Sequence, residues 1–339
     1  MTFMHSFQSV IILSARDIVR IGKRAHIRPM SYIAATNTHQ QIDVPIKGIA
    51  YAICAYFLLA VMNMLAKILA EHHHIIEIAF YRNLVSVIPF LIYILATRQY
   101  ALFKTSKPKA LAARSIIGTA SLVTTFAAFT ALPMAETTVL LFTTTLIIPA
   151  LAFFILKENV GWHRWSAIII GFIGVLFIVG LKGFTGTWIG ISLAIAAALM
   201  HASLGLLLRF MKTESPVTVT FYFVLTGMIL TGICMPFIAK APTMNELYML
   251  IATGIAGGLA QFCLAAALKN APIAVTSPLN YTGLIWATGF DMLIWSIVPG
   301  WPVFAGAAII ISANSYIIYR EHRIHKKKSL ESSAAPDAL

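Results

Sequence analysis

Long apolar runs separated by short polar stretches dominate the chain between residues 48 and 320. Each run is about 20 residues long, which is the length that a helix needs to cross a bilayer. Turn signals such as Lys182-Gly183 and Pro299-Gly300 stand between the runs. The pattern predicts an all-α membrane protein with ten transmembrane helices. They are expected at residues 48–70, 75–97, 110–131, 134–156, 162–181, 188–210, 217–239, 246–268, 272–296 and 302–320.

Composition agrees with this pattern, because 59% of the residues are hydrophobic and 11% are charged. A soluble domain has about 25% charged residues. The net charge of +13 comes from residues in the gaps between apolar runs, so topology explains it better than nucleic-acid binding. The cysteines Cys54, Cys234 and Cys263 lie inside apolar runs without metal-ligand spacing. We expect no cofactor, no metal and no nucleic acid, with a small molecule and the lipid bilayer as partners.

The distribution of Lys and Arg predicts the orientation in the membrane. With the N-terminus in the cytoplasm, 21 of these residues fall on the cytoplasmic side and three on the outer side. Cytoplasmic loops of membrane proteins carry such an excess. Both termini are therefore expected in the cytoplasm, after an even number of spans.

Two segments lie outside the apolar region. Residues 1–47 form a basic N-terminal extension, which fits an interfacial helix, a disordered tail or a start site placed too early, with Met30 as the first residue. Residues 321–339 are basic and then polar, and a disordered cytoplasmic tail is expected there.

The two halves of the apolar region resemble each other, residues 48–182 matching residues 186–320. Matches at offsets between 136 and 142 include Gly48 with Gly190, Phe80-Tyr81 with Phe221-Tyr222, Gly118 with Gly254, and Val139 with Val275. Five helices in each half are an odd number, so the second half is expected to be inverted. Inverted repeats are an architecture of secondary transporters, whose substrate site lies at the midplane between the halves.

Polar triplets interrupt the fourth and ninth predicted helices at matching positions. They are 143-TTT-145, with Thr144 and Thr145, and 279-LNY-281, with Asn280 and Tyr281. Each lies about ten residues, or roughly 15 Å, into its helix. Pro149 and Pro278 interrupt the same helices, and freed carbonyls are tolerated only when buried or lining a wet cavity. The triplets therefore predict one wall of a central pocket.

Charged residues inside predicted helices suggest a gate or a substrate anchor. Arg82 and Asp291 each lie roughly 8–10 Å below the outer surface, and a buried membrane charge is usually paired and functional. An Arg82–Asp291 or Arg82–Glu77 pair is expected, either as a gate or anchor or as a purely structural pair. Glu136 opens the fourth helix, where it complements the helix dipole or couples transport to protons.

Further polar and aromatic residues are candidates for the pocket lining. Asn63 and His201 face each other if the repeat alignment holds, and His201 is either titratable or neutral packing. Gln261 aligns with Thr125 at mid-membrane. The aromatic candidates are Phe126, Phe262, Tyr281 and Trp286, which stack on a flat ring or pack against lipid.

Two local motifs favour a structural interpretation, with a metal site as the alternative for the histidines. The run 71-EHHH-74 predicts an interfacial loop, because three consecutive histidines do not share one helix face. The glycines of 254-GIAGG-258 allow close helix contact, and they lack the spacing and the basic residue of a phosphate loop.

The chain resembles the drug/metabolite transporter superfamily, and its EamA family in particular. Residues 131–175 and 267–287 carry the likeness. The run 157-KENVGWHRW-165 before 171-GFIGV-175 is similar to the bacterial S-adenosylmethionine uptake branch, and 277-SPLNYTGLIWA-287 is similar to the riboflavin-importer branch. Two positions depart from the family pattern, namely Asp291 in place of Gly and Ile297 in place of Glu.

The resemblance implies a secondary transporter in the bacterial inner membrane, with a homodimer possible. It implies alternating access around a central pocket, without enzymatic activity. A metabolite similar to S-adenosylmethionine or riboflavin is expected, with import favoured slightly. An exporter of amino acids, metabolites or drugs is the alternative, and a membrane-embedded enzyme, a channel or a scaffold is a distant one.

Overall fold

A computed structural model describes residues 45–157, 161–180, 187–211, 214–271 and 273–333. The expected N-terminal extension lies outside these residues, apart from its last three positions, which begin the first helix. Within the described residues the regular structure is entirely helical, which confirms the predicted all-α class. The elements are α2 (Pro45–Leu69), α3 (Ile75–Ala96), η1 (Tyr100–Phe103), α4 (Pro108–Ala131), α5 (Met134–Leu141), α6 (Thr144–Leu156), α7 (Trp162–Gly180), α8 (Trp188–Phe210), α9 (Pro216–Gly232), α10 (Met235–Ile238), α11 (Met244–Asn270), α12 (Ile273–Thr276), η2 (Ser277–Tyr281), α13 (Thr282–Ile294) and α14 (Trp301–Ser333).

Seven helical segments among the described residues are long and apolar enough to cross a membrane. They are Ile46–Leu69, Ile75–Ala96, Pro108–Ala131, Met134–Ile155, Trp188–Leu208, Met244–Asn270 and Trp301–Arg320. Two shorter apolar helices occupy the fifth and seventh predicted crossings. The ninth predicted crossing is divided among α12, η2 and α13. The helices are therefore where the sequence expects them, and the number of ten crossings stays a prediction.

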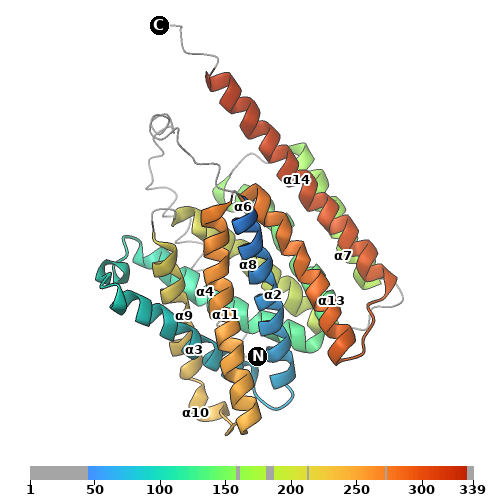
Figure 1. The fold of residues 1–339 in the computed structure, drawn as a ribbon. Helices are drawn as coiled ribbons and strands as arrows, with labels where there is room; N and C mark the ends of the chain where they lie inside the picture. The colour runs from blue at the N-terminus through green and yellow to red at the C-terminus, as the bar shows by residue number, and fades with distance from the viewer. Residues whose placement is uncertain (1–44, 158–160, 181–186, 212–213, 272, 334–339) are drawn as a thin grey trace.

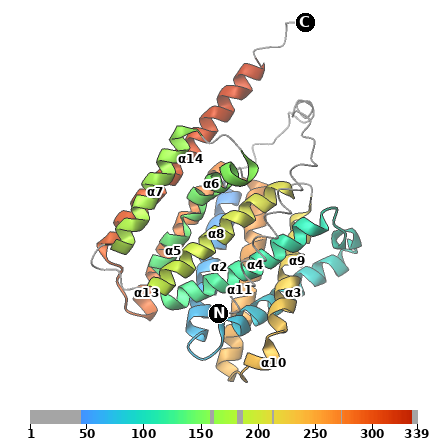
Figure 2. The ribbon, with the colours of Figure 1, turned by 180° about the vertical axis from the view of Figure 1, so that it is seen from behind.

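Helix packing repeats between the two halves of the chain. The first helix of each half packs along the third helix of the other half, as α2 with α11 and α8 with α4. The corresponding helices α3 and α9 pack together, and so do α7 and α14. Figure 1 shows α2 and α11 side by side on one face of the bundle, and Figure 2 shows α4 and α8 on the opposite face. Exchanging the halves leaves these pairings unchanged, which is the pattern that a two-fold relation produces.

Two glycines make the matching close contacts possible. A Cβ added at Gly48 would lie 2.3 Å from the Cβ of Ala271, at the end of α11. A Cβ added at Gly190 would lie 2.6 Å from the Cγ of Leu132, at the end of α4. Gly48 and Gly190 are partners in the sequence repeat, so the repeat corresponds to equivalent helix crossings.

The fourth and ninth segments are both discontinuous at the polar triplets. The first break lies between α5 and α6, at Phe142 and Thr143, and the second is the 3-10 turn of η2. Hydroxyl groups satisfy freed carbonyls at both breaks, because Thr145 Oγ1 donates to Phe142 O at 2.8 Å and Thr282 Oγ1 donates to Leu279 O at 2.6 Å.

Pro149 acts differently from the expectation. It lies inside α6, and the interruption of the chain comes before it. Proline at this position removes the N–H that would pair with the carbonyl of residue 145. Pro149 therefore leaves a carbonyl unpaired one turn earlier, near the threonines.

The C-terminal helix is longer than expected. It continues to Ser333, past residue 320, where the sequence predicts the beginning of a disordered tail. Figure 1 shows this end of α14 extending beyond the bundle. Lysine and glutamate are good helix formers, which allows the last helix to continue over residues 321–333, and the cytoplasmic tail stays a prediction.

Candidate functional site

Asp291 is a buried carboxylate on α13 that binds the start of α5 in the other half of the chain. Its Oδ1 accepts the backbone N–H of Met134 at 2.9 Å, and its Oδ2 accepts that of Ala135 at 2.8 Å. The N-cap residue of α5 is Pro133, which has no side-chain acceptor. A helix start leaves N–H groups unpaired and carries partial positive charge. Asp291 therefore supplies in trans the cap that α5 lacks.

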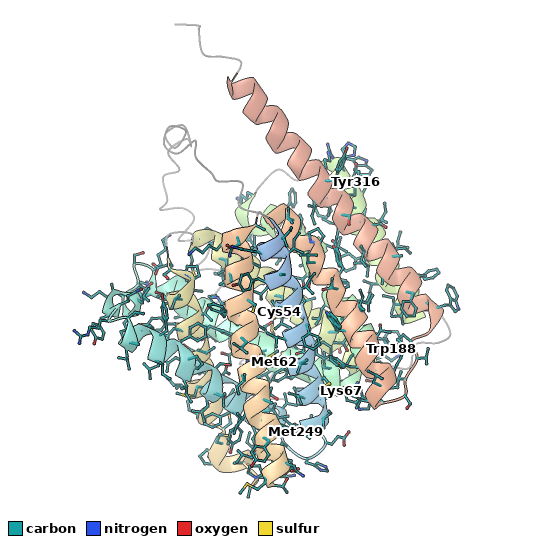
Figure 3. The ribbon with its side chains drawn as sticks, viewed as in Figure 1. Cys54, Met62, Lys67, Trp188, Met249 and Tyr316 are labelled. Atoms are coloured by element: carbon teal, nitrogen blue, oxygen red, sulfur yellow. The ribbon has the colours of Figure 1, made fainter. Side chains whose placement is uncertain are left out.

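A lysine completes this group. Lys67 Nζ donates to Leu132 O at 2.7 Å and lies 4.7 Å from the centroid of the Trp295 ring. It is near enough to Asp291 and Glu136 to interact with both carboxylates electrostatically. Figure 3 places Lys67 in the lower part of α2. The structure thus brings together two predicted gating residues, and the sequence missed Lys67 as their partner.

Arg82 does not form either of the ion pairs expected from the sequence. It is 1% exposed on α3, and its Nη1 donates to Asn83 Oδ1 at 2.8 Å. The two carboxylates proposed for it have other partners, since Asp291 caps α5 and Glu77 lies beside a histidine. The expected Arg82–Asp291 and Arg82–Glu77 pairs are therefore wrong.

A second arginine lies near Arg82. Arg114 lies in the second turn of α4, and its Nε and Nη1 atoms are buried. The Cζ atoms of Arg82 and Arg114 lie 5.5 Å and 4.7 Å from the centroid of the same ring, Phe223. The sequence signal for Arg114 was its place after the start of an apolar run rather than before it.

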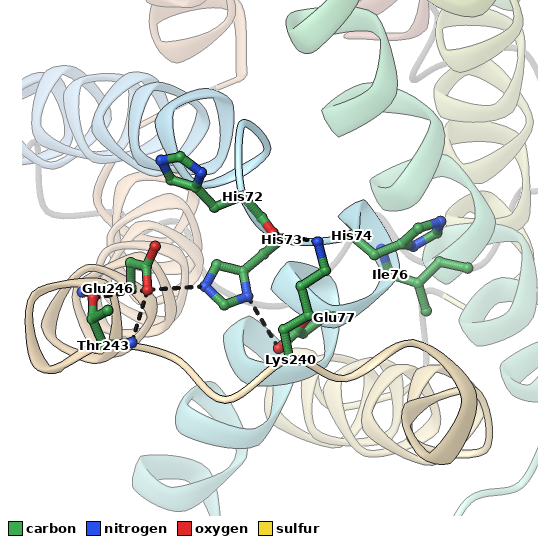
Figure 4. A network of polar contacts seen from close by, with 8 residues as sticks. All are labelled: His72, His73, His74, Ile76, Glu77, Lys240, Thr243 and Glu246. Atoms are coloured by element: carbon green, nitrogen blue, oxygen red, sulfur yellow. Dashed lines mark hydrogen bonds and ion pairs between the residues drawn. The ribbon is translucent and has the colours of Figure 1, made fainter.

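A histidine links two carboxylates at the opposite end of the bundle from the α14 extension (Figure 4). His73 Nδ1 lies 3.2 Å from Glu77 Oε1, and His73 Nε2 lies 3.5 Å from Glu246 Oε2. Glu246 also forms a capping box with Thr243 at the start of α11. Lys240 Nζ donates to His72 O at 3.3 Å nearby. The described residues contain no cluster suited to a metal.

The group joins the two halves of the chain, since His73 and Glu77 belong to the first and Glu246 to the second. Carboxylates accept hydrogen bonds, and a neutral imidazole has only one N–H. Two carboxylate contacts on one ring are both favourable only when both ring nitrogens carry protons or one carboxyl is protonated. The run predicted as an interfacial loop therefore contains a buried contact between the two halves.

The expected pocket residues lie on the helices that meet between the halves. Three of them have a buried polar atom without a hydrogen-bond partner among the described residues: Asn63 Oδ1, Thr125 Oγ1 and Trp286 Nε1. Buried polar atoms are nearly always paired, so these three are candidates for contact with a polar ligand.

The remaining candidates are mostly accounted for by packing. Thr144 Oγ1 donates to Ala198 O at 3.4 Å, and Thr145 Oγ1 donates within its own turn. Tyr281 forms an edge contact with Phe142 at 5.0 Å. Phe126 is buried among apolar side chains of α2, α3 and α11. His201 on α8, Gln261 on α11 and Asn280 in η2 are partly buried.

Comparison with known proteins agrees with the fold. The EamA-like transporter family matches the chain twice, over residues 46–180 and 188–319. The S-adenosylmethionine uptake transporter of Rickettsia prowazekii is 30% identical over 290 residues, which cover 85% of this chain and 96% of that protein. The pseudopaline exporter CntI of Pseudomonas aeruginosa is 23% identical, over 80% of this chain and 96% of the exporter.

A solved crystal structure supports the fold alone. It superposes with a TM-score of 0.59 at 16% sequence identity, and the match covers 82% of this chain and 98% of the other. Together with the apolar helices, the bacterial relatives indicate a multi-pass bacterial membrane protein of the drug/metabolite transporter type. The chain belongs to the EamA-like transporter family.

Proposed function

We propose that the protein is a secondary transporter that imports a small organic metabolite similar to S-adenosylmethionine across the inner membrane. The observation that carries this proposal is the pair of discontinuous helices at matching positions of the two halves. Discontinuous helices at the repeat interface form the substrate and ion sites of several transporter folds. The uptake transporter among the relatives supports the substrate class and the direction.

In this proposal the halves are inverted repeats of five spans, and both termini lie in the cytoplasm. Asn63, Thr125 and Trp286 direct unpartnered polar atoms toward the substrate. The other lining residues are Arg82, Phe126, Thr144, Thr145, His201, Gln261, Asn280 and Tyr281. Alternating access requires contacts that break when one half rocks against the other.

Three carboxylates have places suited to such contacts. Asp291 joins α13 to α5, Glu136 lies close to the same lysine, and Glu77 lies in the histidine-linked group that reaches α11. The Asp291 contact and the histidine-linked group connect the halves, whereas Glu136 and Lys67 both belong to the first half. We assign them to gating or ion coupling.

Uptake of labelled substrates tests the proposal. Cells expressing the protein are expected to accumulate S-adenosylmethionine above an empty-vector control, and riboflavin serves as the alternative substrate. Asn280→Ala is expected to reduce uptake at equal expression, whereas Asn245→Ala, a change at an exposed position, is expected to leave uptake unchanged. Equal uptake by all cells, including the control, contradicts the proposed substrates.

Export is the second candidate, because a pseudopaline exporter is also related to the chain. Counterflow in proteoliposomes separates the functions without assuming a direction. A carrier exchanges labelled for unlabelled substrate across the membrane, whereas a scaffold does not. Loss of a labelled compound from preloaded cells, without any uptake, favours export.

A further inference from the structure

Arg82 is buried and Arg114 is partly buried, and the described part of the chain does not neutralise either cation. Neither arginine takes part in the ion pairs of His73 with Glu77 and Glu246. Nε of Arg82 and Nε and Nη1 of Arg114 are buried and have no hydrogen-bond partner there. An unpaired charge is costly at membrane depth, and such residues mark substrate pathways.

The two guanidinium groups are close together. The Cζ atoms lie 5.5 Å and 4.7 Å from the same Phe223 centroid, so the distance between them is at most 10.2 Å. Their charges repel each other across this separation. The aromatic ring offers each of them a weak attraction, which does not remove the repulsion between them.

The surrounding backbone approaches the two side chains closely. A Cβ added at Gly257 would lie 2.8 Å from Arg82 Nε, and one added at Gly118 would lie 3.2 Å from Arg114 Nη1. A Cβ added at Gly227 would lie 2.6 Å from Asn83 Nδ2, on the residue that accepts from Arg82. Glycines on α11, α4 and α9 thus make room for these polar groups, so their placement is specific.

The repeat places the cluster near the symmetry axis. The alignment that matches Phe80-Tyr81 with Phe221-Tyr222 also matches Arg82 with Phe223. Arg82 and Phe223 contact each other. Residues that are exchanged by a two-fold rotation and also touch must lie close to the rotation axis. With inverted halves this axis lies in the membrane midplane, where the substrate site of such transporters is found.

We propose that Arg82 and Arg114 bind an oxyanion of the transported molecule, a carboxylate or a phosphate. This inference rests on the proposed function and narrows it to substrates that carry such a group. Guanidinium groups bind both oxyanions with paired N–H donors. Phe223 contacts both arginines as an apolar surface, and Asn83 holds Arg82 in place.

The first test measures binding without assuming a substrate. Purified protein in nanodiscs of phosphatidylcholine alone is heated in sodium phosphate, sodium acetate or sodium chloride at equal ionic strength. Phosphate and acetate are expected to raise the melting temperature more than chloride does. In Arg114→Gln the concentration needed for half of the effect is expected to rise at least about tenfold, the loss of one charged hydrogen-bonding partner.

Variants keep this test informative when one of them folds poorly. Arg82→Lys and Arg114→Lys retain the charge without the paired donors and are expected to have intermediate affinity. Arg98→Gln changes an exposed arginine and is expected to behave as the wild type. Equal stabilisation by chloride and phosphate in the wild type overturns the proposal, and so does an unchanged phosphate effect in Arg114→Gln.

A lipid headgroup is the other source of a phosphate group. In nanodiscs that contain phosphatidylglycerol, free phosphate is expected to retain its effect. Stabilisation by phosphatidylglycerol with no effect of free phosphate or acetate would mean that the arginines hold lipid, and the proposal would be overturned.

The second test uses counterflow of S-adenosylmethionine and of its decarboxylated form, which lacks only the carboxylate. Wild-type protein is expected to prefer the carboxylated form at least about tenfold. Equal transport of both forms, with no phosphate effect, overturns the oxyanion site and leaves the carrier function standing. A phosphate effect lost in Arg114→Gln, without counterflow of either form, supports the site and rejects this substrate.

Discussion

Two groups of buried charge in this protein differ in how the chain treats them. At one end of the bundle, His73 lies between the carboxylates of Glu77 and Glu246, so basic and acidic side chains face each other. In the arginine cluster, Arg82 and Arg114 face an aromatic ring and an amide instead. The first group contains its own acidic and basic partners within 3.5 Å and suits a contact that holds the halves together. The second has an excess of positive charge and suits an external anion.

The largest loss of stability is expected when His73 is removed from its contacts with Glu77 and Glu246. His73→Leu leaves the fully buried carboxyl group of Glu77 without its imidazole partner. Removing one partner of a buried pair costs about 3–5 kcal/mol, so a large fall in the melting temperature is expected. Thermal unfolding in detergent measures it.

A second substitution shows whether charge is the cause. Glu77→Gln in the His73→Leu background removes the stranded charge, and part of the lost stability is expected to return. His72→Leu alters an exposed neighbour and is expected to have little effect. If the double variant is no more stable than His73→Leu, packing rather than charge accounts for the loss.

The next substitution gives the arginine cluster a carboxylate partner. Asn83→Asp places a carboxylate where an amide oxygen already accepts from Arg82 at 2.8 Å. A hydrogen bond between charged groups is stronger than a neutral one, and a gain of about 1–3 kcal/mol is expected. The new carboxylate also competes with the oxyanion of the substrate, so transport is expected to fall at least about tenfold.

Stability and transport are measured on the same preparations. Asn245→Asp adds the same charge at an exposed position and is expected to alter neither quantity strongly. A variant Asn83→Asp that loses stability and keeps transport would contradict the view that the arginines need an anion.

A third buried charged side chain, Asp291, is stabilised by hydrogen bonds from two backbone N–H groups in addition to the nearby Lys67. Asp291→Asn can accept only one of the two N–H groups that the carboxylate accepts now. The loss resembles the removal of a helix cap, about 1–2 kcal/mol, and a moderate fall in melting temperature is expected. Thr187→Ala removes the side-chain cap of α8 and gives the scale for one such bond. Unchanged stability and transport in Asp291→Asn would exclude both the cap and the gate.

The sequence predicts the helices well and their partners poorly, for a physical reason. Apolar runs of spanning length and the repeat both follow from local pattern, and the helix positions agree to within a few residues, apart from the end of α14 at Ser333. The partners of Asp291 are two backbone N–H groups of another half, which no side-chain pattern announces. The same holds for Arg114, because the sequence does not show whether a basic residue near the beginning of a helix is exposed to water or buried. Charge pairs depend on packing between distant segments, so the expected Arg82–Asp291 pair could not be checked before the structure.

The smallest effect is expected for a charge outside the membrane. Glu214 Oε1 accepts the hydroxyl of Ser106 at 2.6 Å and its backbone N–H at 2.9 Å. The Ser106 hydroxyl, with its backbone N–H and the charge of Lys107, lowers the pKa of Glu214 below its ordinary value. A carboxyl group with a lowered pKa stabilises the folded protein above its unfolded pKa, and this contribution is lost as the pH falls through the folded pKa.

Glu214→Gln is therefore expected to remove a small part of the stability at neutral pH and none at a pH below the folded pKa of Glu214. Melting temperatures of the variant and the wild type between neutral and acidic pH measure the difference. Because water screens this surface group, the difference is expected to be far smaller than that for His73→Leu. A fall in melting temperature as large as that in His73→Leu would show that burial does not decide how much stability is lost. The difference between the His73 group and the arginine cluster would then need another cause.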